Sequence, residues 1–332
     1  MTEVLFVTNH VPPDRAGAFA ALHEHVPLRL ALFGGRSHHA TAGLDDPGVP
    51  HVRITQREAH ALAASRRFAA VVCGTAGRVA LPAAFLGARR ARVPFVLWSA
   101  LWGDLRTPAH RAARPLLRRV HREAAIVVGY GPHVTAYAQR LGARAVAVAP
   151  QAVDNAFWSA PVEVPEDRPF TALFVGRDAP EKGLPVLREA WRRAALPDAR
   201  LEVVGGATPE QVRNSYAGAD VLVIPSIATR RFLEPWGLVA NEAMNQHLPI
   251  IATDAVGAAA GGLVRDGRNG LVVAAGDPDA LAEALGTLYA DPTLRARLGA
   301  NGAEDVAAFT YAAWADGFAN ALHTATNGAV PC

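Results

Sequence analysis

The sequence predicts an α/β protein made of two mostly parallel, doubly wound sheets in two domains. Apolar runs of strand length alternate with amphipathic stretches of helix length along the chain. Such alternation is typical of a parallel sheet covered by helices on both faces. The proline-rich polar segment 161–169 separates two series of this alternation and has the composition of an interdomain linker. The chain has 332 residues, which is enough for two ordinary domains.

The first series contains seven strand candidates, each short and rich in apolar residues, as expected of strands buried on both faces. These are Val4–Thr8, Leu28–Phe33, His51–Ile54, Ala70–Cys73, Phe95–Trp98, Ile126–Val128 and Val146–Ala149. Helices are expected between most of them, at Arg15–His25, Ala76–Arg90, Pro108–Glu123 and Pro132–Leu141. We therefore expect residues 1–160 to form an N-terminal domain.

The second series predicts a domain over residues 161–310. Its strand candidates are Phe170–Val175, Arg200–Val204, Val221–Ile224, Ile250–Thr253 and Leu271–Val273. Its helix candidates are Glu181–Ala194, Pro209–Tyr216, Gly237–Gln246 and Asp277–Tyr289. Asp277 before Pro278 suits a helix start, so the Asp-x-Asp spacing there indicates a cap rather than a metal site. Residues 311–332 form a terminal segment with one more helix, Tyr311–His323, which can pack back on the N-terminal domain.

Charge is distributed unevenly between the two halves. Residues 1–150 contain 19 Arg against 8 acidic residues, a net charge of +11, and the remainder has a net charge of −8. An anionic membrane surface, an acidic acceptor and the partner domain are the candidate partners of the basic half. Nucleic acid is not expected, because the sequence has no aromatic stacking platform, zinc knuckle or helix-turn-helix signature.

Targeting signals and metal clusters are not expected either. The N-terminus runs directly into a strand candidate without the basic and apolar regions of a signal peptide. No apolar stretch is long enough to span a bilayer. The two cysteines lie far apart, which favours a reducing compartment over a disulfide scaffold. We therefore expect a cytoplasmic protein, with association at the inner face of the membrane as an alternative.

One lysine, Lys182, stands in a chain whose other basic residues are all arginine. It follows a strand candidate that ends at Gly176-Arg177 and precedes Gly183. A compact ammonium beside a rigid guanidinium fork suits a diphosphate. The structural alternative is a surface arginine and a lysine at a helix start.

A second element brackets seven residues between two carboxylates, Glu234 and Glu242. Pro235 and Gly237 fit a turn into a helix, whose first backbone N–H groups would form an anion site. One carboxylate can face a sugar ring and the other a ribose. An ordinary solvated helix position is the alternative for Glu242.

Taken in order, these motifs resemble the donor-binding domain of family 4 glycosyltransferases, which are retaining enzymes of the GT-B fold. The resemblance covers about Phe170 to Tyr289 and rests on four features in the family's order. These are Gly-Arg…Lys-Gly, Pro225-Ser226, the two spaced glutamates and Asn269-Gly270. It implies two Rossmann-like domains that face each other across a cleft, with the acceptor on residues 1–160 and the donor on residues 161–310.

The resemblance also implies roles for individual residues. Arg177, Lys182 and Glu234 would be catalytic, the two cations holding the donor diphosphate and the carboxylate contacting the donor sugar. The further donor-binding residues would be Gly17, Gly176, Gly237, Leu238, Val239 and Glu242. The co-substrate would be a nucleotide-diphosphate sugar, with a UDP-sugar favoured, and neither a metal ion nor another cofactor would be needed.

The first domain departs from the family pattern. Only Gly17 is a candidate for the glycine pair after the first strand. The segment Phe95–Trp102 contains no histidine where many members have one. Trp98, Trp102 and His10 are candidates for an acceptor or sugar site, with core or structural roles as the alternative. Arg106–Arg122 is a basic amphipathic helix candidate, interrupted at Pro115, that can lie on an anionic membrane or be merely solvated.

The second domain departs in two places. The loop 258–262 lacks the family's usual glutamate, and the chain before Pro209 is shorter than usual, as if one strand–helix step were missing. The functional prediction is a retaining glycosyltransferase that uses a nucleotide-diphosphate sugar and an acceptor that is a glycan, a lipid or a small metabolite. The alternatives are a sugar-nucleotide epimerase or hydrolase of the GT-B fold and a catalytically inactive nucleotide-sugar-binding protein.

Overall fold

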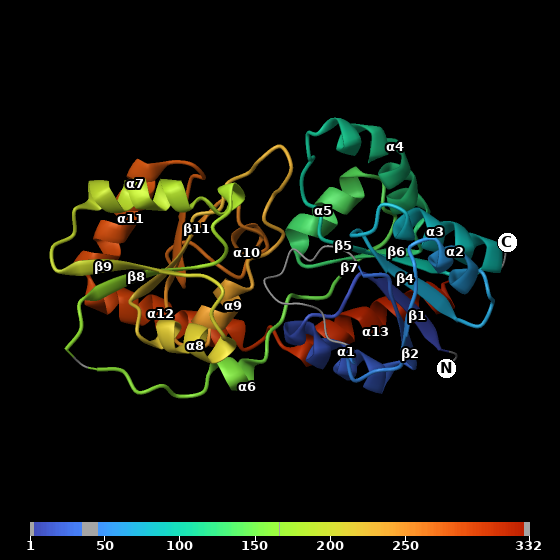
Figure 1. Ribbon diagram of the computed structural model, residues 1–332, viewed down its shortest axis with the longest axis horizontal. Helices are drawn as coiled ribbons and strands as arrows, with labels where there is room; N and C mark the ends of the chain where they lie inside the picture. The colour runs from blue at the N-terminus through green and yellow to red at the C-terminus, as the bar shows by residue number, and fades with distance from the viewer. Residues whose placement is uncertain (1–2, 35–45, 166, 329–332) are drawn as a thin grey trace. The chain divides into compact units, whose positions relative to one another are not determined.

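The computed structural model describes residues 3–34, 46–165 and 167–328. The chain forms two compact units, one of residues 1–152 with 311–332 and one of residues 153–310 (Figure 1). Residues 153–160, which the sequence assigned to the first domain, thus lie in the second unit. The Asn155 side chain accepts a hydrogen bond from Asn245 at 3.0 Å, and Trp158 packs edge-on against Tyr216. These contacts attach the segment to the second unit.

The first unit contains a sheet of seven parallel strands in the order β3-β2-β1-β4-β5-β6-β7. Their bounds are β1 Val4–Thr8, β2 Leu28–Leu32, β3 His51–Arg53, β4 Ala70–Gly74, β5 Phe95–Ser99, β6 Ile126–Gly129 and β7 Val146–Val148. On β1, Val4 and Phe6 belong to one apolar core, whereas Leu5 and Val7 belong to another. Successive side chains enter opposite faces, so both faces of this sheet are buried.

Helices cover both faces of this sheet. They are α1 Pro13–His25, α2 Glu58–Ala63, α3 Ala80–Ala91, α4 Pro108–Glu123, α5 Pro132–Arg140 and α13 Tyr311–Asn327. Helix α13 lies beside α1 although the whole second unit separates them in sequence (Figure 1). Trp314 of α13 packs edge-on against Phe19 of α1, and Phe318 packs against Phe6 of β1. The terminal helix is therefore part of the core of the first unit.

The second unit contains a sheet of five parallel strands in the order β12-β11-β10-β8-β9. Its strands are β8 Phe170–Val175, β9 Ala199–Val204, β10 Val221–Ile224, β11 Ile250–Thr253 and β12 Gly270–Val273. Its helices are α6 Asn155–Trp158, the 3₁₀ turn η1 Pro180–Lys182, α7 Leu184–Ala194, α8 Pro209–Ala217, α9 Val239–Met244, α10 Gly257–Ala260, α11 Pro278–Ala290 and α12 Pro292–Val306. The loops that follow β8, β10 and β11 meet at the carboxyl edge of the sheet.

The predicted fold class is confirmed, and the predicted strands are present with ends within one residue of the observed ones. The helices differ more. The helix predicted from Glu181 is broken at Gly183, whose left-handed backbone ends η1 before α7 begins. Helix α4 continues through Pro115, although an interruption was expected there. Helix α12 was not predicted.

Within the described ranges, no helix is both long enough and apolar enough to cross a membrane.

Candidate functional site

Most of the predicted site residues of the second unit lie on loops at the carboxyl edge of its sheet. Strands β8, β10 and β11 are parallel neighbours, so the segments that follow them emerge side by side. Such an edge is where open α/β sheets bind ligands. The loop after β8 contains Arg177 and Lys182, and the loop after β10 contains Ser226 and Glu234.

Gly183 joins the first of these loops to the second. Its φ is +70°, and a Cβ at this position would lie 1.8 Å from the carbonyl oxygen of Pro225. Next to it, the Ile227 N–H donates to the Glu181 carbonyl at 3.0 Å. Only glycine allows both the backbone conformation and the close approach. Lys182 is consequently fixed against the end of β10.

Lys182 and Glu234, which the sequence singled out separately, form an ion pair with Nζ 2.5 Å from Oε2. The lysine side chain is 22% exposed and the glutamate side chain 8%. Ser226 Oγ donates to the same carboxylate oxygen at 3.3 Å, and the Phe232 ring lies 6.0 Å from Nζ. The pair is therefore partly withdrawn from water, where an ammonium and a carboxylate interact more strongly than at the surface.

The backbone around Glu234 is fixed by the loop after β11. Gly257 N–H donates to the Glu234 carbonyl at 3.1 Å, and Ala258 N–H donates to the Trp236 carbonyl at 2.8 Å. A Cβ on Gly257 would lie 2.0 Å from the Pro235 carbonyl oxygen. This close contact holds the Glu-Pro-Trp turn against the neighbouring loop.

Gly237, Leu238 and Val239 lead into α9, which is shorter than predicted. Gly237 has a φ of +93°, and the helix proper spans Val239–Met244. The buried Trp236 ring donates from Nε1 to Asn241 Oδ1 at 2.7 Å, across the start of the helix. The Ala240 N–H donates to the Gly237 carbonyl at 3.0 Å and the Glu242 N–H to the Leu238 carbonyl at 3.1 Å, so contact with an anion stays a prediction for the N–H groups of Gly237, Leu238 and Val239 only.

Glu242 lies on α9, and its side chain is bound by a residue of α8. The Tyr216 hydroxyl donates to Glu242 Oε2 at 2.7 Å. Burial, and then the adjacent Glu242 charge, raise the pKa of Tyr216 well above its usual value, so this hydroxyl stays protonated. Sequence reasoning missed Tyr216, which belongs to none of the motifs and carries no signal of its own.

Arg177 and Gly176 lie at the end of β8. The Gly176 N–H donates to the Val204 carbonyl at 2.9 Å. The Arg177 side chain is 44% exposed, with Nη2 3.6 Å from Glu181 Oε1. The structure thus joins Lys182 to Glu234, whereas Arg177 stands on the solvent side of the same loop.

The predicted residues of the first unit have packing roles. Gly17 lies within α1, where a Cβ would fall 2.3 Å from the Tyr311 ring. Trp98 packs edge-on with Phe6 and other rings of the core. Trp102 lies 5.3 Å from His133, ring to ring. Burial lowers the pKa of His10. That these residues contact donor or acceptor stays a prediction.

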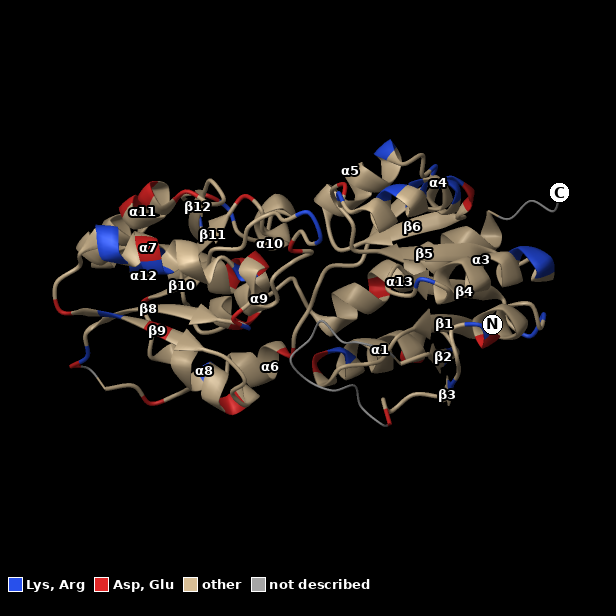
Figure 2. Cartoon of the chain, turned by 45° about the horizontal axis from the view of Figure 1, so that its top comes forward, with Lys and Arg blue, Asp and Glu red and all other residues tan. Residues whose placement is uncertain are grey.

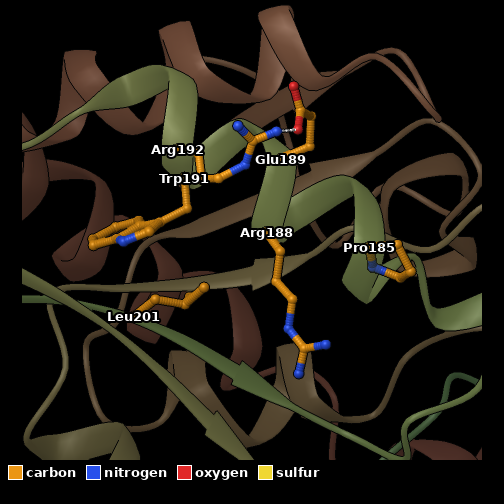
Figure 3. A pocket seen from close by; sticks show the side chains of 6 residues that line it. All are labelled: Pro185, Arg188, Glu189, Trp191, Arg192 and Leu201. Carbon is orange, nitrogen blue, oxygen red and sulfur yellow. Dashed lines mark hydrogen bonds and ion pairs between the residues drawn. The ribbon is translucent and has the colours of Figure 1, made fainter.

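Two other features of the second unit lie apart from these residues. A groove of about 510 Å³ runs between α7 and the edge strand β9, lined by the residues shown in Figure 3. None of the predicted site residues lines this groove. Among the residues that the structure describes, no group of three or more His, Cys, Asp and Glu is arranged to hold a metal ion.

Comparisons with known proteins show what the chain is similar to. Residues 205–305 match the family model described as glycosyl transferases group 1. A phosphatidyl-myo-inositol mannosyltransferase of Mycobacterium leprae is 34% identical over 184 residues, 48% of this chain and 48% of that protein. A D-inositol 3-phosphate glycosyltransferase of Corynebacterium glutamicum is 36% identical over 180 residues, 43% of this chain and 40% of that protein. The chain thus spans about half the length, or less, of these curated relatives.

Solved structures resemble the chain over nearly its whole length. The Anabaena protein HepE in complex with UDP has a TM-score of 0.77 at 17% identity, covering 98% of this chain and 100% of that one. A sucrose-phosphate synthase from Thermosynechococcus elongatus has a TM-score of 0.74 at 19% identity, covering 96% of this chain and 98% of that one. The fold is the GT-B fold, and the second unit of the chain matches the glycosyl transferases group 1 family over residues 205–305.

Proposed function

We propose that this protein is a glycosyltransferase that moves a sugar from a nucleotide-diphosphate sugar to an acceptor hydroxyl. The observation that carries the proposal is the Lys182–Glu234 ion pair at the carboxyl edge of a sheet whose domain matches the glycosyl transferases group 1 family over residues 205–305. HepE, which shares the fold, was solved with UDP and with UDP-glucose. This supports a UDP-sugar as the donor.

The chemistry follows from the charges at this edge. Breaking the bond between the anomeric carbon and its oxygen transfers negative charge to the leaving diphosphate. The Lys182 ammonium has three protons, of which Glu234 accepts one, so the others are available to phosphate oxygens. Arg177 adds a guanidinium from the solvent side. Cations fixed before the reaction stabilise the developing charge without reorganising.

We further propose that the transfer retains the configuration at the anomeric carbon. The acceptor would attack from the face that the diphosphate leaves, and the diphosphate would take the acceptor proton. Glu242, held by Tyr216, would accept hydrogen bonds from the ribose of the donor. In this scheme Lys182 and Arg177 supply the positive charge, so the transfer proceeds without a metal ion.

Two variants test the proposal. Lys182→Ala and Glu234→Gln should each lower kcat/KM for transfer by about a hundredfold or more, the range found when one preorganised electrostatic contact is removed. Arg192→Ala is the matched control, because Arg192 is a cation of the same unit that is 73% exposed and paired with Glu189. Turnover within a few-fold of wild type in both variants, with circular dichroism unchanged, would exclude this site.

Ligand screening separates the remaining alternatives. A thermal-shift panel of UDP-, GDP-, ADP- and dTDP-sugars should identify the donor, since a ligand at about a hundred times its Kd adds about 2.7 kcal/mol of stability. An epimerase or hydrolase would consume donor at one rate whatever acceptor is added. A binding protein would bind donor without turnover.

We also propose that α4 contacts an anionic membrane surface. Arginines gather along this helix (Figure 2), and Arg114 and Arg119 have side chains that are 48% and 52% exposed. Vesicles of phosphatidylglycerol should sediment the protein at low salt, whereas phosphatidylcholine vesicles should not. Equal sedimentation with both lipids would mean that α4 is an ordinary solvated helix.

A further inference from the structure

Arg15 is a buried arginine of the first unit that the proposed chemistry does not use. It lies in the first turn of α1 and is 6% exposed. Its guanidinium carbon lies 5.4 Å from the Trp98 ring centroid and 5.8 Å from that of Tyr130. Nη2 donates to Gln151 Oε1. Arginine is always charged, so a full positive charge is held within the protein here.

The donors around this charge outnumber the acceptors. In the part of the chain that the structure describes, Nε and Nη1 of Arg15 have no hydrogen-bond partner, nor does Nε1 of Trp98. The nearest carboxylate is Asp14, whose Oδ2 is 4.0 Å from Nε, which is beyond hydrogen-bond distance. Buried donors are nearly always paired, and an unpaired buried charge is costly. Asp14 Oδ2 is a buried acceptor that also has no hydrogen-bond partner, but the unpaired N–H donors of Arg15 and Trp98 outnumber it. This surplus of donors indicates a ligand that accepts hydrogen bonds.

The position of the cluster agrees with a ligand site. Arg15 follows β1, Trp98 lies on β5, Tyr130 follows β6 and Gln151 follows β7. All four thus lie at the carboxyl edge of the seven-stranded parallel sheet, where α/β sheets bind ligands. The N-terminus of α1, a helix of 13 residues, adds a positive partial charge at the same place.

We propose that Arg15, together with the Trp98 Nε1–H, binds an oxyanion, a phosphate or a carboxylate, of one of the two substrates. This assignment rests on the proposed glycosyl transfer. The planar guanidinium presents two parallel N–H groups to such a group, and the flanking aromatic rings exclude water from it. Asp14 is a like-charged neighbour of the bound oxyanion and weakens its binding. The oxyanion belongs either to the acceptor or to the diphosphate of the donor.

Calorimetric titration with inorganic phosphate, acetate and UDP tests the site in full-length protein. Arg15→Gln and Trp98→Phe each remove donors but keep most of the side-chain volume. The first should raise the Kd for phosphate by at least about tenfold, a change of about 1.4 kcal/mol, and the second by a smaller factor. Asp14→Asn should tighten phosphate binding. The double variant Arg177→Ala/Lys182→Ala should keep the Arg15-dependent phosphate site, which separates it from the donor site of the second unit.

The source of the oxyanion follows from the UDP titration. An unchanged Kd for UDP in Arg15→Gln assigns the site to the acceptor, and a weakened Kd assigns it to the donor. A phosphate Kd that is unchanged in a folded Arg15→Gln protein overturns the proposal. So does an Asp14→Asn variant that loses as much thermal stability as Arg15→Gln, because Asp14 would then be the partner of the guanidinium. If only the transferase assay fails, the phosphate titration still tests the Arg15 site, so the failure of the proposed function and the failure of this site can be told apart.

Discussion

A glycine positions the only lysine of the chain. Gly183 combines a left-handed backbone with a close approach to the Pro225 carbonyl, and it directly follows Lys182. The lysine then meets Glu234 across the two loops. At this scale the sequence indicated which residues to examine but not how they pair. The ion pair depends on the register of two parallel strands, and the support of Glu242 by Tyr216 comes from a helix that no motif marks.

Gly183→Ala should destabilise the protein and lower transfer together. A left-handed alanine costs about 1–2 kcal/mol, and the contact with Pro225 adds to this because a backbone oxygen cannot move far. Gly206→Ala is the matched control, since Gly206 also has a φ of +70° but nothing within 4 Å of its added Cβ. Chemical denaturation and transfer assays should show a larger loss for Gly183→Ala. Equal losses in the two variants would show that the close contact between Gly183 and the Pro225 carbonyl does not hold the two loops together.

Tyr216→Phe should weaken donor binding while leaving the fold intact. The ring is fully buried and stays in place, so the lost hydrogen bond should cost only about 1 kcal/mol of stability. Glu242 loses the hydroxyl that holds it, so KM for the donor should rise several-fold with kcat little changed. Tyr289→Phe, which removes a hydrogen bond to Pro197, is the control. An unchanged KM for the donor in Tyr216→Phe would show that Glu242 does not contact the donor in the way proposed.

At the scale of elements, the helices differ from prediction for a physical reason. Helix α12 contains Gly299 and Gly302, which lower helix propensity in sequence. In the fold, a Cβ on Gly299 would lie 2.0 Å from the His247 carbonyl oxygen. Close packing therefore requires a glycine at this position, and the same glycine weakens the helix signal in the sequence. The strands were predictable because runs buried on both faces are continuous and apolar.

The Asn269-Gly270 motif is structural: the buried Asn269 amide donates to Leu263 and Asp305.

Asp305 attaches α12 to the segment before β12. Hydrogen bonds from Arg268 first, and also from Arg265 and Asn269, lower its pKa to about 2. A lowered carboxylate pKa stabilises the fold above the usual pKa near 4, and this contribution is lost as pH falls towards 2. Asp305→Asn should therefore reduce the free energy of unfolding by roughly 2 kcal/mol at pH 7, and the difference should disappear near pH 2.

Glu304→Gln is the control for this comparison, because Glu304 contacts the same Arg268 but its side chain is 74% exposed. Exposed pairs contribute about 0–1 kcal/mol. Urea unfolding of both variants across pH 2–7 measures the difference. A pH-independent loss in Asp305→Asn would show that Asp305 acts by packing rather than through its charge.

At the scale of the whole molecule, the chain completes its first unit only after passing through the second. Helix α13 returns to α1 and buries Trp314, Phe318 and Leu322. The alternation of strands and helices was enough to predict two doubly wound units. It offered packing of the terminal helix on the N-terminal domain only as an option, because an apolar helix face fits either sheet.

A chain that ends at Thr310 should fail to fold its first unit. Each large buried side chain that is lost costs about 3 kcal/mol, and together these losses reach the usual margin of 5–15 kcal/mol. Limited proteolysis should degrade residues before Ala152 while the second unit resists, which serves as the internal control. A truncated chain with both units protected would show that α13 is dispensable.

The return of α13 also sets the order of events at the ribosome. Chains grow at about 5–20 residues per second, so the sheet of the first unit waits on the order of ten seconds, while Val153–Thr310 is made, for the helix that closes its core. During that interval the apolar face around Phe6 and Phe19 is open to solvent, whereas the second unit can already fold. We expect this delay to make the early part of the chain the segment on which chaperones act during synthesis.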